Sequence, residues 1–62
     1  MSPEAEAIER LLRTRGREFV LTMFAPAHVS EADLVRVIWG HPVAPDVMSR
    51  IQATLKERLT AT

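Results

Sequence analysis

The side chains that most often perform chemistry in proteins are scarce in this sequence. It has two histidines, His28 and His41, and no cysteine, and no cluster of Asp or Glu stands near either histidine at metal-ligand spacing. A zinc site needs about four such ligands in recognisable pairs. Ser30 and Ser49 have no neighbours that would activate a serine nucleophile, and two glycines are too few for a phosphate-binding loop. We therefore expect no catalytic residue, no metal, no cofactor and no small-molecule substrate, and a protein that is not an enzyme.

The charged side chains indicate more about possible binding partners than the histidines do. Eight basic and eight acidic residues give a formal net charge of zero, so no overall field attracts the chain to nucleic acid or to anionic lipid. The charges are unevenly distributed, because Glu4, Glu6 and Glu9 precede a run of arginines at positions 10, 13, 15 and 17. Local charge is therefore a better guide to partners than the total.

The length of the chain, 62 residues, leaves room for a single domain, which we expect to cover residues 1–62. A domain of this size buries only about 60% of the surface that its unfolded chain exposes, and without cysteine it has no disulfide to reinforce it. Self-association, most simply as a homodimer, is therefore expected. No apolar run approaches the ~20 residues that span a bilayer, and the N-terminus is acidic where a signal peptide is basic. These features predict a soluble, cytoplasmic protein without a membrane partner.

Two helices are expected in the first part of the chain. A serine-proline pair is typical of a helix start, and an apolar series at helical spacing runs from Pro3 to Arg15. The apolar segment 18–24 is too short for its periodicity to distinguish helix from strand. Its Phe, Val and Thr favour a strand, but no other segment offers a partner strand. We expect a buried helix that ends by Ala25, because Pro26 restricts the residue before it, with a short strand at 18–24 as the alternative.

Two further helices are expected in the second part. Ser30 and Asp33 have the spacing of a capping box, and the helix that they open ends at Gly40. Pro45 begins a last helix, which runs to about Leu59. One face of that helix is apolar and consists of Val47, Met48, Ile51, Leu55 and Leu59. The expected fold is thus all-α, with four to five short helices.

This order of elements resembles the lambda-repressor/Cro-type helix-turn-helix proteins. The residues that carry the resemblance are Val29-Ser30, Leu34, Arg36-Val37-Ile38, Gly40, Pro45, Arg50-Ile51 and Leu55. In that family the helix that begins at the Val-Ser pair is the recognition helix, which here would extend from Ser30 to Trp39. The connection before it is longer than is usual in the family. The resemblance implies a small sequence-specific transcriptional regulator, phage or mobile-element encoded, that binds double-stranded DNA as a homodimer on a two-fold operator.

The resemblance also implies which residues would meet DNA. The exposed positions at the start of the recognition helix face base edges in such a motif, and here they are Ser30, Glu31, Ala32 and Val35. Contacts to phosphate would come from Arg17, Arg36 and His41. Arg36 has an alternative role, because it can pair with Asp33 at helical spacing.

The remaining apolar residues allow two interpretations. Trp39 either closes the core or anchors a dimer interface. The apolar face of the last helix continues beyond what short helices can cover, so Leu55 and Leu59 are expected dimer contacts. An alternative function is a non-DNA-binding helical interaction module, of the anti-activator or antitoxin kind, that holds a protein partner on this face or on Trp39. The zero net charge and the carboxylates of the third helix motivate that alternative.

Overall fold

The first helix, α1, has the bounds that its sequence predicts. The computed structural model describes residues 2–60, and the side chains of residues 2–58. Helix α1 spans Pro3–Arg15, and the Oγ of Ser2 accepts a hydrogen bond from the backbone N–H of Ala5 at 3.1 Å. It ends at Gly16, whose φ of 89° is a conformation that side chains with a Cβ rarely adopt. The predicted cap residues therefore determine both ends of this helix.

The ambiguous segment after α1 is a helix, as expected, and the strand alternative is wrong. Helix α2 spans Arg17–Phe24, and the residues that the structure describes include no strand. Val20 and Phe24 are both fully buried. Their four-residue spacing places them on the same side of a helix. In a strand Val20 and Phe24 would also share one face, but Thr22 would lie between them on that same face. Thr22 is exposed, and the helical arrangement leaves it on the outer side.

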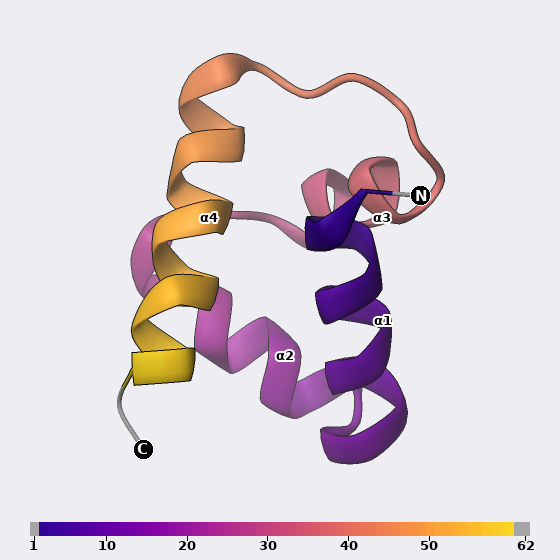
Figure 1. Cartoon of the computed structure of the whole chain (residues 1–62), viewed down its shortest axis with the longest axis vertical. Helices are drawn as coiled ribbons and strands as arrows, with labels where there is room; N and C mark the ends of the chain where they lie inside the picture. The colour runs from indigo at the N-terminus through magenta and orange to yellow at the C-terminus, as the bar shows by residue number, and fades with distance from the viewer. Residues whose placement is uncertain (1, 61–62) are drawn as a thin grey trace.

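The connection after α2 contains a short turn that accounts for its extra length. A 3-10 turn, η1, spans Ala25–Ala27. His28 follows in the left-handed conformation with φ of 58°, and its N–H donates to the carbonyl of Ala25 at 3.0 Å. The chain then reverses, and Val29 enters the core. Figure 1 shows this segment crossing behind the molecule from the end of η1 to α3.

The last two helices also agree with the sequence. Helix α3 spans Glu31–Ile38, with Ser30 and Trp39 as its flanking caps, and helix α4 spans Pro45–Thr60. Figure 1 shows the connection between them as an extended arch at the top, after which α4 descends beside α2. No helix in the described part is both long enough and apolar enough to cross a membrane.

All four helices contribute to one core. Helix α1 packs against α2, α3 and α4. The buried side chains are Ala5, Ile8, Val20, Phe24, Val29, Leu34, Val37 and Ile51. Because Leu34 and Val37 are buried, the opposite side of α3 is left at the surface.

Candidate functional site

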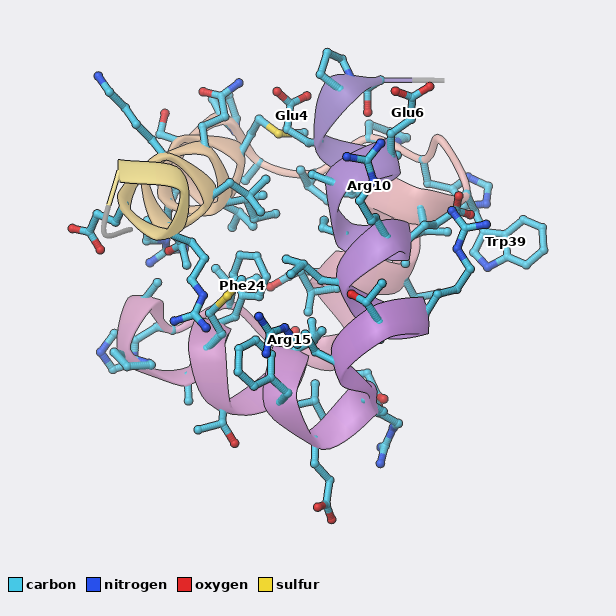
Figure 2. All side chains as sticks on the ribbon, turned by 60° about the horizontal axis from the view of Figure 1, so that its bottom comes forward. Glu4, Glu6, Arg10, Arg15, Phe24 and Trp39 are labelled. Atoms are coloured by element: carbon cyan, nitrogen blue, oxygen red, sulfur yellow. The ribbon has the colours of Figure 1, made fainter. Side chains whose placement is uncertain are left out.

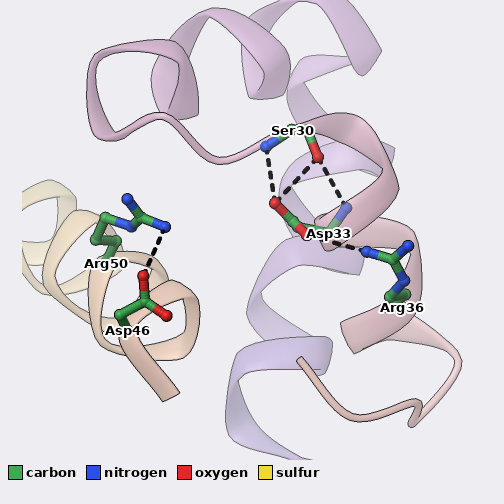
Figure 3. A network of polar contacts seen from close by, with 5 residues as sticks. All are labelled: Ser30, Asp33, Arg36, Asp46 and Arg50. Carbon is green, nitrogen blue, oxygen red and sulfur yellow. Dashed lines mark hydrogen bonds and ion pairs between the residues drawn. The ribbon is translucent and has the colours of Figure 1, made fainter. Parts of the chain in front are cut away.

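The start of α3 is held by a reciprocal capping box. The backbone N–H of Asp33 donates to Ser30 Oγ at 3.2 Å, and the backbone N–H of Ser30 donates to Asp33 Oδ2 at 3.3 Å. The Ser30 hydroxyl also donates to Asp33 Oδ2, at 3.0 Å (Figure 3). Two backbone N–H groups that a helix start leaves unpaired are thereby satisfied. The hydroxyl of Ser30 is consequently occupied within the chain.

Arg36, a predicted phosphate contact, pairs with Asp33, as its alternative role requires. The distance from Arg36 Nη1 to Asp33 Oδ1 is 3.2 Å. Figure 3 shows Ser30, Asp33 and Arg36 along one side of α3, and a similar pair between Asp46 and Arg50 at the start of α4. These pairs lie at the surface, where each contributes about 0 to 1 kcal/mol.

Arg17, a second predicted phosphate contact, forms an ion pair with Glu31, a predicted base-facing residue. Arg17 Nη2 lies 3.0 Å from Glu31 Oε1, and Arg17 Nε donates to Glu31 Oε2. The hydrogen bond from Arg17 and its positive charge lower the pKa of Glu31, and the same pair raises the pKa of Arg17. The pair joins the first residue of α2 to the first residue of α3.

The four predicted base-facing residues, Ser30, Glu31, Ala32 and Val35, are all exposed on α3. Ser30 and Glu31 are engaged as described, and the side chains of Ala32 and Val35 have no polar group. We use the name α3 face for the exposed side chains of residues 30, 31, 32, 35, 36 and 39. Each charged or hydroxyl-bearing side chain of this face has a partner within the chain.

The apolar part of the α3 face is its most exposed part. Val35 is 44% exposed and Trp39 is 74% exposed. Figure 2 shows the Trp39 indole extending away from the helices. The expectation that Trp39 closes the core is therefore wrong. Its position explains why, since Trp39 follows Val35 by one helical turn on the outer side, and the core positions are already filled by Leu34 and Val37.

A groove of about 160 Å³ lies beside the α3 face. It runs between α1, α2 and α3, and its apolar lining includes Leu12, Leu21, Val35 and Ile38. The Arg17–Glu31 pair stands at its edge. Leu12 and Leu21 cannot be recognised as surface residues from the sequence, because half-buried apolar side chains on short helices have the same pattern as core residues. We call this depression the α3 groove.

The remaining predicted site residues lie apart from the α3 groove. His41 is exposed, and its backbone N–H donates to the carbonyl of Arg36 at 2.7 Å. Leu55 is half-buried and lines a different depression, between α1 and α4. Figure 2 shows α4 on the opposite side of the molecule from Trp39. The side chain of Leu59 lies outside the described residues. The structure thus joins Arg17 with Glu31, but it does not bring Trp39 and Leu55 into one surface.

Phe19 makes contacts with arginines that were not predicted from the sequence. Phe19 on α2 has two guanidinium groups near its ring, with Arg15 at 5.5 Å and Arg58 at 4.8 Å from the ring centroid. The four-residue spacing of Arg15 and Phe19 is a signal that could have indicated the first contact. The second joins α2 to α4 and has no local signal. Both contacts place positive charge at the same end of the molecule.

No metal-binding cluster occurs among the described residues, since no three His, Cys, Asp or Glu side chains gather there. Comparison of the chain with models of known protein families, with curated proteins and with solved structures finds no match.

Proposed function

We propose that this chain is a protein-binding module that holds a partner protein on the α3 face and in the α3 groove. One observation supports this most directly. The charged and hydroxyl side chains of the face are already paired within the chain, whereas Val35 and Trp39 remain exposed. Direct reading of bases needs free donors and acceptors, whereas protein interfaces are enriched in exposed aromatic anchors of this kind.

The chemistry of the surface defines the kind of partner. The groove is apolar at its centre, and its edge is neutral because Arg17 and Glu31 cancel. An amphipathic helix of another protein, with aliphatic side chains directed at the groove, satisfies both conditions. Covering the apolar area of Trp39 and Val35 contributes about 25 cal/mol for each Å² removed from water.

Fluorescence provides a direct test, because Trp39 is the only tryptophan. The tagged chain is used to capture proteins from nuclease-treated host lysate, and each stoichiometric partner is then purified and titrated against the native chain. We expect the Trp39 emission to shift to shorter wavelength and to become protected from acrylamide quenching. Trp39→Ser should weaken the affinity about thirtyfold, as for an interface anchor, whereas Trp39→Phe should weaken it much less.

The matched control is Thr22→Ala, an exposed position on α2 away from the groove. It should leave the affinity unchanged. A partner that binds the Trp39→Ser variant as tightly as the native chain would contradict the proposal. So would the absence of any stoichiometric protein partner.

A second candidate, sequence-specific DNA binding as a transcriptional regulator, is favoured by a separate observation. The residues that such a motif directs at bases are exposed. Of the three residues that it directs at the core, Leu34 and Val37 are buried and Ile38 is half-buried. Arg17 and Arg36 can leave their surface pairs at a cost of about 0 to 1 kcal/mol each. Selection of DNA from a random pool tests this candidate. An enriched two-fold site whose affinity falls with salt would support it, and affinity no greater than that for random duplex would exclude it.

A further inference from the structure

A second surface of the molecule, between α1 and α4, has charged residues placed so that they could pair with those of a second copy of the chain. Two adjoining depressions between α1 and α4 share Ala7 and Leu55 and together form one groove, which we call the α1–α4 groove. Its apolar centre consists of Ala7, Leu11 and Leu55. Glu4 lines one end, and Arg10 and Arg58 line the other. Figure 2 shows Glu4 near the start of α1 and Arg10 further along the same helix.

The spacing along α1 is symmetrical. Glu4 and Arg10 each lie three residues from Ala7, or about 4.5 Å along the helix axis. If a two-fold axis passes beside Ala7, the α1 helices of two copies run antiparallel. Glu4 of each copy then faces Arg10 of the other, and the small Ala7 side chains allow the helices to approach closely. A two-fold interface requires this kind of self-complementarity.

The two charged groups are available for such a contact. Within the part of the chain that the structure describes, neither Glu4 nor Arg10 belongs to an ion pair of its own. Arg58 adds to the positive end, where it would also face Glu4 of the second copy. Lys56 lines the same end as Glu4. The attraction between the two copies therefore depends on Glu4 of one copy pairing with Arg10 and Arg58 of the other.

We infer that the α1–α4 groove binds a second copy of this chain, in an antiparallel arrangement of the two α1 helices about Ala7. The inference does not depend on the proposed function, because the α3 face and the α3 groove lie on another side of α1. It assigns a position to the self-association that the small size of the domain leads one to expect. Leu55 belongs to this interface, whereas Trp39 does not.

Charge reversal tests the arrangement by sedimentation at low salt. Glu4→Arg places an arginine opposite Arg10 of the partner copy, and Arg10→Glu places a carboxylate opposite Glu4 of the partner copy. Each change should weaken the dimer about tenfold, because two favourable pairs become repulsive. An equimolar mixture of the two variants should restore association as a heterodimer. One chain of that heterodimer has arginine at positions 4 and 10 and the other has glutamate at both, so both pairs between positions 4 and 10 are again of opposite charge, and only Arg58 of the Arg10→Glu chain then faces an arginine.

The matched control is Glu9→Arg, which makes the same charge change on the opposite side of α1. It should not alter the dimer, and circular dichroism should show the same helix content in every variant. Dimerisation of the native chain should weaken as salt rises. A native chain that stays monomeric at millimolar concentration would overturn the inference. So would a dimer that responds equally to Glu9→Arg and Glu4→Arg.

An independent measurement covers the case in which a charge variant does not fold. The chain has no cysteine, so Ala7→Cys places a single thiol beside the two-fold axis. Under mild oxidation this variant should form a covalent dimer quickly, whereas Ser49→Cys, on the exposed part of α4, should form it slowly. Equal rates for the two variants would contradict the arrangement.

Discussion

At the scale of single residues, the Arg17–Glu31 pair shows how two side chains of opposite charge alter each other. The hydrogen bond from Arg17 holds the pKa of Glu31 below its ordinary value of 4.5. A carboxyl whose pKa is lowered on folding stabilises the native state above its unfolded pKa, and this contribution is lost as the pH falls through the lowered folded value. The pair therefore matters at neutral pH and disappears in acid.

We expect an NMR titration of the native chain to give Glu31 a pKa below 4.5. In the Arg17→Gln variant the pKa should return towards 4.5, because the charged donor is gone. A Glu31 that titrates identically in the two chains would show that the pair does not form in solution.

The capping box at the start of α3 indicates that the Ser30 hydroxyl stabilises the fold. Removal of the hydroxyl by Ser30→Ala leaves the N–H of Asp33 without its acceptor, and we expect a loss of about 1 kcal/mol in the free energy of unfolding. For a domain of this size, that corresponds to a fall of about 4–8 °C in Tm. Ser49→Ala is the control and should change Tm little, because Ser49 is exposed and lies away from the ends of α4. Equal changes in Tm for the two substitutions would indicate that the Ser30 cap does not stabilise the fold.

At the scale of helices, the junction between α1 and α2 consists of the single residue Gly16. Its φ of 89° and ψ of 165° lie in a region that is essentially restricted to glycine. A Cβ at this position would meet no atom within 4 Å, so any cost of Gly16→Ala comes from the backbone alone. We expect a loss of about 1–3 kcal/mol in the free energy of unfolding, measured by urea denaturation. Thr14→Ala, at an exposed position of α1, should reduce the free energy of unfolding much less. A Gly16→Ala chain as stable as this control would contradict the prediction.

The helices were more predictable than the surface that they form. Local signals at Ser2, Ser30 and Pro45 determine where helices begin, and these signals act within a few residues. The segment 17–24 needed its tertiary setting, because burial of Val20 and Phe24 against α1 and α4 determines its conformation. The Arg17–Glu31 pair joins residues 14 positions apart, and such contacts follow from packing that no local pattern encodes.

Trp39 illustrates the same limit. A large apolar side chain at the end of an amphipathic helix has two possible environments, and the core was the wrong one. The deciding fact is the rotation of α3, which directs residues 34 and 37 inward and leaves residues 35 and 39 outside. That rotation depends on how α3 packs against α1, and so the exposed apolar surface could be identified only from the structure.

At the scale of the whole molecule, the two grooves have separate roles under the two proposals. The α3 groove is neutral and apolar, the exposed Trp39 follows the groove residue Val35 by one helical turn, and together they suit a foreign helix. The α1–α4 groove has Glu4 beside Lys56 at one end and Arg10 beside Arg58 at the other, and under our inference it binds a second copy through Glu4 and Arg10. A dimer about Ala7 would leave both α3 faces open, so one dimer would hold two partners. Trp39→Ser should therefore weaken partner binding while leaving the sedimentation of the dimer unchanged.

A final prediction links self-association to thermal stability. If dissociation of the dimer accompanies unfolding, mass action makes Tm depend on protein concentration. For two chains of this length, a tenfold increase in concentration should raise Tm by up to about 5 °C, as followed by circular dichroism. Glu4→Arg removes the pairing of charges across the interface, and its Tm should depend much less on concentration, whereas Glu9→Arg should behave as the native chain does. A native Tm that is constant over a hundredfold range of concentration would mean that the folded monomer is stable by itself, and the α1–α4 groove would then need another explanation.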